Sequence, residues 1–198
     1  MTARADEAER TGQRIVDAML HRFATLPYGQ IRLEDVAADA GVAVQTVMRR
    51  FGNKAGLLVT VVERELSVIA ANRAAIAGAS PADTISALAD HYETYGALIL
   101  KMYSEASLVE GLDEIAGRGR AYHVAWCRTA FAADLPDDRD DSGRERRMAQ
   151  IVVVCDARTW SILRLESQLG AAQTKLALSE MLSPLLATGV ARIGMSAI

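Results

Sequence analysis

The sequence has few of the residues that cross-link or interrupt a chain. Its 198 residues include four prolines and two cysteines. Two cysteines are too few for a disulfide framework, so Cys127 and Cys155 are expected to be buried thiols, with a redox-sensing pair as the alternative. No stretch rich in glycine, serine and proline divides the chain into halves, and hydrophobic residues make up 51%. This composition is typical of a globular protein rather than a disordered one.

The chain also lacks long apolar runs and an excess of positive charge. No uninterrupted apolar run approaches the roughly 18 residues that a membrane helix needs. The N-terminus, MTARADEAER, has no apolar core of a signal peptide. We therefore expect a soluble, cytoplasmic protein with no membrane partner. Its formal net charge is −3, so binding to nucleic acid would require a local basic patch.

Signals of catalysis and of metal binding are missing as well. The three histidines lie far apart in the sequence, and no nucleophile elbow, phosphate loop or HExxH motif occurs. His123 and Cys127 have the spacing of metal ligands on a helix, but a structural zinc site needs four ligands. We expect no enzyme, no metal site and no cofactor.

What the sequence does contain is helical periodicity. Thr11 is a candidate N-cap for a first helix, in which Ile15, Met19 and Phe23 recur at helical spacing. Further helices are expected at 53–77, 82–106, 119–134, 144–168 and 172–186. No alternation of strands with helices is visible, so the sequence predicts an all-α fold of about nine helices.

Two short helices are predicted within residues 33–51. Leu33, Val36, Ala37 and Ala40 fall on one face, and Gly41 follows as a helix-ending glycine. Residues 44–51 contain several β-branched side chains and could form a strand. The helical reading is favoured because a strand would place Arg49 on the same face as the apolar Phe51. Two short helices joined by a tight turn make a helix-turn-helix.

The second of these helices would turn polar and basic side chains outwards. Gln45 can pair with adenine and Arg49 with guanine in a major groove, and Thr46 can bond to phosphate or base. Lys54 begins the next helix, where free backbone N–H groups favour a phosphate. The predicted DNA-binding residues are Gln45, Thr46, Met48, Arg49, Arg50, Lys54 and Val44.

The segment RLEDVAADAGVAVQTVMRRFGNKAGLL, residues 32–58, resembles the DNA-binding region of the TetR family of transcriptional regulators. The resemblance implies a three-helix DNA-binding domain at 1–54 and a larger helical domain for ligand binding and dimerisation at 55–198. The sequence departs from the family pattern at three positions. Ala43 replaces the usual helix cap, Met48 replaces a tyrosine, and Val44 replaces a polar or basic residue.

In the larger domain, aromatic, sulfur and sparse polar side chains recur along three predicted helices. Such groups can line a cavity for a mostly apolar ligand, although the same pattern is also typical of a plain core. Asp156 stands alone in an apolar run, where it could pair with Arg158, bind a ligand or face solvent. The candidate ligand-binding residues are Tyr95, Ile99, Met102, Tyr103, His123, Trp126, Asp156 and Trp160.

The last two predicted helices carry more apolar surface than one helix pair can bury, which indicates a homodimer. Their apolar side chains are Val154, Ile162, Leu165, Leu176, Leu178, Leu182, Leu185 and Leu186. Together these features imply a TetR-like repressor that binds a palindromic operator in double-stranded DNA as a dimer and is released by a small effector. The alternative is a helical ligand- or protein-binding domain that no longer binds DNA specifically.

Overall fold

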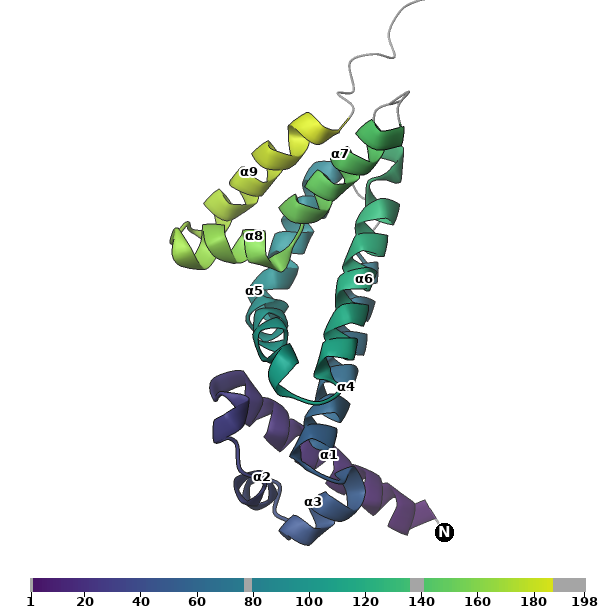
Figure 1. Ribbon diagram of the computed structural model, residues 1–198, viewed down its shortest axis with the longest axis vertical. Helices are drawn as coiled ribbons and strands as arrows, with labels where there is room; N and C mark the ends of the chain where they lie inside the picture. The colour runs from purple at the N-terminus through teal and green to yellow at the C-terminus, as the bar shows by residue number, and fades with distance from the viewer. Residues whose placement is uncertain (1, 77–79, 136–140, 187–198) are drawn as a thin grey trace, which may run out of the picture. The chain divides into compact units, whose positions relative to one another are not determined.

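The computed structural model describes residues 2–76, 80–135 and 141–186. Within these residues the chain forms nine α-helices and no strand, which confirms the all-α prediction (Figure 1). The α-helices are α1 (Thr2–Thr25), α2 (Leu33–Asp39), α3 (Val44–Phe51), α4 (Lys54–Ala74), α5 (Pro81–Glu105), α6 (Leu112–Ala130), α7 (Asp141–Val154), α8 (Ala157–Ser161) and α9 (Ala171–Leu182). Single turns of 3₁₀-helix lie at Tyr28–Gln30, Ala106–Leu108, Ala132–Asp134 and Ser183–Leu185, and a π-helical turn at Ile162–Glu166.

The chain folds into two compact units. The first contains Met1–Ala70 and Ala97–Arg120, and the second contains Ala71–Gly96 and Ala121–Ile198. The boundaries fall inside α4, α5 and α6, so each of these long helices contributes residues to both units. None of the described helices is long and apolar enough to cross a membrane.

The core of the first unit joins the N-terminal helices to the beginning of α4. The apolar stripe predicted on α1 is fully buried, and so are the inward side chains of α2 and α3. Burying a side chain of this size contributes about 1.5–3 kcal/mol. The fully buried set is Ile15, Met19, Phe23, Val36, Val47, Leu57, Leu58 and Val61.

The core of the second unit is built by α5, α6, α7, α8 and α9. Its larger buried side chains are Ile85, Leu88, Tyr92, Trp126, Phe131, Ile151, Trp160, Leu178 and Leu182. Trp160 approaches the backbone of α5 at Gly96, where a Cβ atom would lie 2.5 Å from the indole ring. The glycine therefore makes room for the tryptophan.

Two predicted helix starts are wrong. α1 begins at Thr2 rather than at Thr11, because residues 2–10 are mostly good helix formers and carry a supporting Glu7–Arg10 ion pair of 2.7 Å. α6 begins at Leu112 rather than at Gly119. A Cβ atom on Gly119 would lie 3.5 Å from Leu66 and 4.0 Å from the Tyr103 hydroxyl. A Cβ atom would thus make ordinary contacts there, and the glycine lies inside α6 without interrupting it.

The single helix predicted over 144–168 is also wrong. α7 ends at Val154, and Asp156 takes an extended conformation with φ −80° and ψ 147°. Its carboxylate accepts the backbone N–H of Arg158 at 2.8 Å, which is the geometry of a helix N-cap. The acid inside the apolar run therefore marks a break and a new helix. The helix predicted over 53–77 forms as α4 and ends at Ala74. Its predicted last residue, Ala77, lies outside the described residues.

Candidate functional site

The turn between α2 and α3 is held by backbone hydrogen bonds. Gly41 has φ +66°, a conformation that favours glycine. Its N–H donates to the Ala38 carbonyl at 3.1 Å, and the Val42 N–H donates to the Ala37 carbonyl at 2.9 Å. This pair of bonds is a Schellman motif, which ends a helix and redirects the chain. The predicted helix-turn-helix and its helix-ending glycine are thus confirmed.

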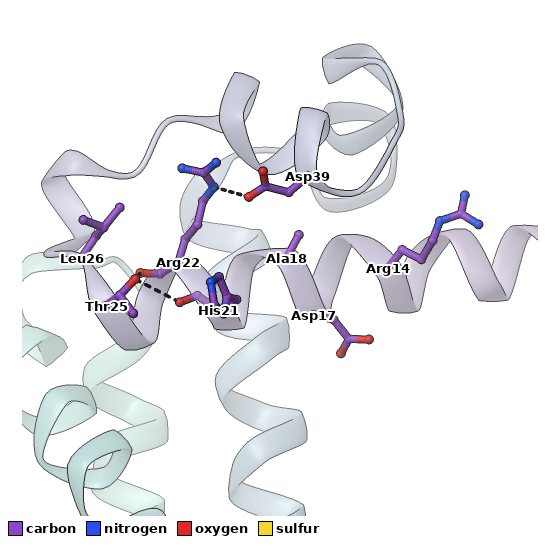
Figure 2. A pocket seen from close by; sticks show the side chains of 8 residues that line it. All are labelled: Arg14, Asp17, Ala18, His21, Arg22, Thr25, Leu26 and Asp39. Atoms are coloured by element: carbon purple, nitrogen blue, oxygen red, sulfur yellow. Dashed lines mark hydrogen bonds and ion pairs between the residues drawn. The ribbon is translucent and has the colours of Figure 1, made fainter.

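Two arginines of α1 fix α2. Arg14 Nε donates to the Ala40 carbonyl at 3.3 Å, which satisfies a backbone group at the end of α2. Figure 2 shows Arg22 extending to Asp39, with Nε 2.6 Å from the carboxylate, and a second carboxylate, that of Asp35, lies 3.6 Å from the same guanidinium. The hydrogen bond from Arg22 holds the pKa of Asp39 below its ordinary value. Arg14, Arg22 and Asp39 help to line an open hollow of about 660 Å³, whose other walls are Asp17, Ala18, His21, Thr25 and Leu26.

The outward face of α3 is exposed and basic. Gln45, Met48 and Arg49 are exposed, whereas Thr46 and Val44 are half-buried. No acidic residue occurs between Val44 and Phe51. Within the described part of the chain, Arg49 makes no ion pair and no hydrogen bond through its side chain. It is therefore free to meet a partner outside the chain.

Arg50 behaves differently from its neighbour. Its guanidinium donates to the Ala8 carbonyl at 2.7 Å and pairs with Glu9 at 3.1 Å, so it is directed back to α1. It also covers Gly12, where a Cβ atom would lie 2.3 Å from the guanidinium. Contact between Arg50 and DNA stays a prediction, and in this structure its charge is shared with Glu9.

Lys54 begins α4 next to the predicted cap. Asn53 accepts the Gly56 N–H at 2.8 Å, which confirms it as the N-cap. The Lys54 ammonium donates to the carbonyls of Tyr28 and Ile31, each at 2.9 Å, and lies 4.1 Å from the centre of the Tyr28 ring. The lysine thus ties the start of α4 to the turn before α2, and a phosphate contact stays a prediction.

The same turn is also bonded to the end of α5. The Tyr28 N–H donates to the buried carboxylate of Glu105 at 3.3 Å. That carboxylate also pairs with Lys101 at 3.2 Å. Sequence reasoning missed this junction, because only the four-residue spacing of Lys101 and Glu105 is visible in the sequence. The backbone of Tyr28 is therefore bonded to both α4, through Lys54, and α5, through Glu105.

The predicted ligand-binding residues fall in both units. Tyr95, His123, Trp126, Asp156 and Trp160 belong to the second unit, and Ile99, Met102 and Tyr103 belong to the first. His123, Trp126, Trp160, Ile99 and Met102 are buried, while Tyr95, Tyr103 and Asp156 are half-buried. Asp156 pairs with Arg158 at 2.9 Å, the first of the alternatives open for it.

Sequence reasoning missed Arg73, which is surrounded by Tyr92, His123 and Trp126 in the second unit. Arg73, near the end of α4, is 4% exposed. Its guanidinium lies between the rings of Tyr92 and Trp126, at 5.2 and 5.0 Å from their centres. It donates to the Tyr92 hydroxyl and, at 3.0 Å, to Nδ1 of His123. Cys127 and Cys155 are free and buried, and the Cys127 sulfur lies 3.8 Å from Nε2 of His123.

Comparison with known sequences places this architecture in a family. The model of the bacterial regulatory proteins of the tetR family matches residues 15–61, which contain α2, α3 and the beginning of α4. The chain is 33% identical over 146 residues to the HTH-type transcriptional repressor KstR of Mycobacterium tuberculosis H37Rv. This match covers 72% of the chain but 61% of the relative, so the chain spans less than two thirds of that protein's length.

Solved structures show the same fold. A transcriptional regulator from Rhodococcus sp. Rha1 superposes with a TM-score of 0.70 at 15% identity, over 88% of this chain and 95% of the other. A regulator from Saccharomonospora viridis, crystallised in complex with choline, gives 0.65 at 15% identity, over 88% and 96%. The helix-turn-helix, the all-α fold and the sequence match agree, and the chain belongs to the TetR family of bacterial regulatory proteins.

Proposed function

We propose that the chain is a ligand-responsive transcriptional repressor of the cytoplasm. It binds a palindromic operator as a homodimer and leaves the operator when a small, largely apolar effector binds. In functional terms, residues 1–54 bind DNA and residues 55–198 bind the effector and form the dimer. The observation that carries the proposal is the outward face of α3, where Arg49 is exposed and without a partner among the described residues.

The residues of α3 suit a major groove. Arg49 and Gln45 are long, exposed donors that can form paired hydrogen bonds with guanine and adenine. Met48 is 51% exposed and offers an apolar contact, for instance to a thymine methyl group. We propose that Thr46, Val44, Arg50 and Lys54 flank these contacts. For Lys54 and Arg50, a phosphate would have to compete with the backbone carbonyls that they now bind.

Exposed apolar side chains on α7 and α9 support the dimer. Val153 is 61% exposed, and Met181 is 43% exposed. With Arg146, Ala149, Gln150, Val154 and Leu185 they line an open groove of about 520 Å³. Ile162, Leu165 and Leu176 are also exposed, whereas Val154, Leu178 and Leu182 are buried within the chain. A second copy of this face would cover the exposed set in a two-fold interface.

The junction at Tyr28 supports a route for release. Lys54 of α4 and Glu105 of α5 both bond to the backbone of Tyr28, which lies five residues before α2. α4 and α5 also contribute residues to the second unit. An effector that shifts either helix would strain the turn and move the helix-turn-helix. A coupling of about 1–3 kcal/mol would change operator affinity 5- to 150-fold.

The structure also offers support for a second function. The N-cap position of α3, Ala43, forms no side-chain cap, and Arg50 is turned towards α1. Val44 and Met48 replace polar residues of the family pattern. These features favour, as the alternative, a helical ligand- or protein-binding domain that has lost specific DNA binding.

The deciding experiment measures binding to the DNA that lies upstream of the protein's own gene, at several salt concentrations. A duplex of random sequence is measured in the same way for comparison. The logarithm of the binding constant should fall with a slope of about −0.9 for each phosphate contact. Arg49→Ala removes an unpaired, exposed charge and should flatten the slope by about one unit. Lys54→Ala should do the same if its ammonium reaches a phosphate.

Arg118→Ala is the matched control. It removes an exposed charge of the same type, on α6 and paired with Glu63 at 2.8 Å, and should leave the slope unchanged. If no sequence-specific complex forms, or if Arg49→Ala and Arg118→Ala give the same slope, the proposal is wrong. The chain would then be better described as a ligand- or protein-binding domain that has lost specific DNA binding.

A further inference from the structure

Arg73 is a buried cation whose hydrogen-bond partners are a tyrosine hydroxyl and an imidazole ring. It is 4% exposed, and its guanidinium contacts the Tyr92 hydroxyl, the His123 ring and the faces of Tyr92 and Trp126. Among the described residues, no carboxylate lies within ion-pair distance of it. Buried charges in proteins are normally paired, because an isolated charge is strongly disfavoured away from water. No carboxylate of the described chain therefore supplies the counter-charge of Arg73. The nearby group that can carry negative charge is the Cys127 thiol, whose pKa is lowered to about 6, first by its hydrogen bond to Cys155 and then by His123 and the charge of Arg73.

Three acidic residues of the second unit already have ion-pair partners of their own. Asp156 caps α8 and pairs with Arg158 at 2.9 Å. Glu93 pairs with Arg164 at 3.0 Å and accepts the Trp160 indole N–H at 3.1 Å. Asp90 pairs with Lys175 at 2.6 Å. None of them neutralises Arg73.

Two nitrogen atoms in this region are buried without a hydrogen-bond partner. They are Nε of Arg73 and Nε2 of His91. The His91 ring packs against Tyr92 and Tyr95, with ring centres 5.7 and 4.9 Å apart. Burial, assisted by the charge of Arg73, lowers the pKa of His91 to about 4, so the ring is neutral at pH 7 and can carry its proton on Nε2. Buried polar groups without a partner are rare in native folds, so each of these two nitrogens needs an explanation.

The partners of Arg73 hold it in one orientation. Because a guanidinium only donates, Nδ1 of His123 must accept, and Nε2 of His123 carries the proton that it donates to the Val152 carbonyl at 3.0 Å. The Tyr92 hydroxyl accepts from Arg73 and donates to the Cys155 carbonyl at 2.7 Å. A cation fixed in this way is preorganised for an anion, and little ordering is left for the ligand to impose.

We propose that Arg73 and His91 form the anion-binding part of the effector site and receive the carboxylate of an otherwise apolar ligand. This inference rests on the proposed function and names the chemistry of the effector. The Nε of Arg73 is a donor, and Nε2 of a neutral His91 can be one; two such donors match the two oxygens of a carboxylate better than the three of a phosphate dianion. The aromatic rings of Trp126, Tyr92 and Tyr95 suit an apolar or aromatic body beside the carboxylate.

The test compares the thermal unfolding of the full chain in sodium benzoate and sodium acetate with unfolding in sodium chloride of equal ionic strength. Benzamide is the neutral counterpart of benzoate. A ligand that binds only the folded protein raises the melting temperature with its concentration. The melting temperature should rise in benzoate and acetate beyond the chloride control and should not rise in benzamide. Trp126 fluorescence should change over the same range of concentrations.

The variants assign the effect to the site. Arg73→Met should abolish the carboxylate-specific rise, and His91→Phe, which keeps an aromatic ring, should weaken benzoate binding about tenfold, as expected for one lost hydrogen bond to a charged group. If Arg73→Met does not fold, His91→Phe alone tests whether the carboxylate binds at this site. Arg128→Met, an exposed arginine of α6 in the same unit, should keep the wild-type response.

The proposal is overturned if carboxylates act on the wild type no more than chloride does, or if the folded cluster variants respond to carboxylates as the wild type does. Operator binding by the unliganded wild type, measured in the same preparation, reports on the proposed function separately. A protein that binds its operator but ignores carboxylates would refute this inference alone.

Discussion

The two units differ in what they leave without a partner. In the first unit, Arg14, Arg22 and Arg64 each bind a carbonyl or a carboxylate of another helix, and Arg49 alone among the arginines discussed is exposed and unpaired. In the second unit, Arg73 is buried without an ion pair among the described residues, and exposed apolar side chains gather on α7 and α9. The two units thus differ in the chemistry of the groups that lack a partner. We propose that α3 binds DNA, that the α7 and α9 groove binds a second copy, and that Arg73 binds an anion.

The largest effect should come from charging the apolar groove. Val153→Glu places a carboxylate on a face that we propose is covered by its own copy, so two like charges would meet near the two-fold axis. We expect a monomer in sedimentation at micromolar concentration and a loss of operator affinity of about 100-fold or more, because one recognition helix reads few bases at about 1–3 kcal/mol each. Val68→Glu, an equally apolar but differently placed exposed position on α4, is the control. A dimeric Val153→Glu variant would contradict the assignment of the interface.

The second effect concerns acid stability and tests whether the cluster around Arg73 excludes further charge. His91 has a pKa of about 4 in the folded chain and about 6.5 when unfolded. Between these values the unfolded chain binds more protons at this residue, so the free energy of unfolding should fall as the pH drops from 6.5 to 4. His91→Phe should lose this part of the pH dependence.

Denaturant titrations at several pH values measure the effect. The comparison is between the two slopes of stability against pH, so a uniform loss of stability in the variant does not affect it. A variant with the slope of the wild type would show that His91 is accessible to protons in the folded chain.

The smallest effect should come from a paired arginine. Arg64 links α4 to α1 through Asp17 at 2.6 Å and also pairs with Glu65 at 3.0 Å. Arg64→Met should lower the free energy of unfolding by about 0.2–1 kcal/mol, the range for ion pairs at a protein surface. Arg49→Met should change the stability less, because no ion pair is lost. Equal stability losses in the two variants would remove the distinction between paired and unpaired arginines.

The sequence was sufficient for the helix-turn-helix because its determinants are local. The spacing of Val36, Ala37 and Val47 and the position of Gly41 define short helices and a turn whatever the rest of the chain does. The predicted helix boundaries were wrong where the role of a single residue cannot be read from its spacing. Gly119 lies inside α6 rather than at its start, and Asp156 caps a new helix within an apolar run.

The polar cluster around Arg73 was only partly visible in the sequence, for a different reason. His123, Trp126 and Asp156 attracted attention as rare polar or aromatic groups on apolar helices. Arg73 resembled one more surface charge at the end of a long helix. Its burial depends on Tyr92, His123 and Trp126, which lie 19 to 53 residues away in the sequence. Contacts over such separations are set by tertiary packing and not by any local pattern.

The contact between Arg50 and Gly12 gives the chain a means of adjusting its charge. Because glycine at position 12 leaves room above α1, the guanidinium folds back towards Glu9. A single methyl group at position 12 would displace the flexible end of Arg50 and release a second cation beside Arg49. Affinity for a polyanion can thus be tuned, in evolution or by design, through a residue of α1 and without any substitution in α3.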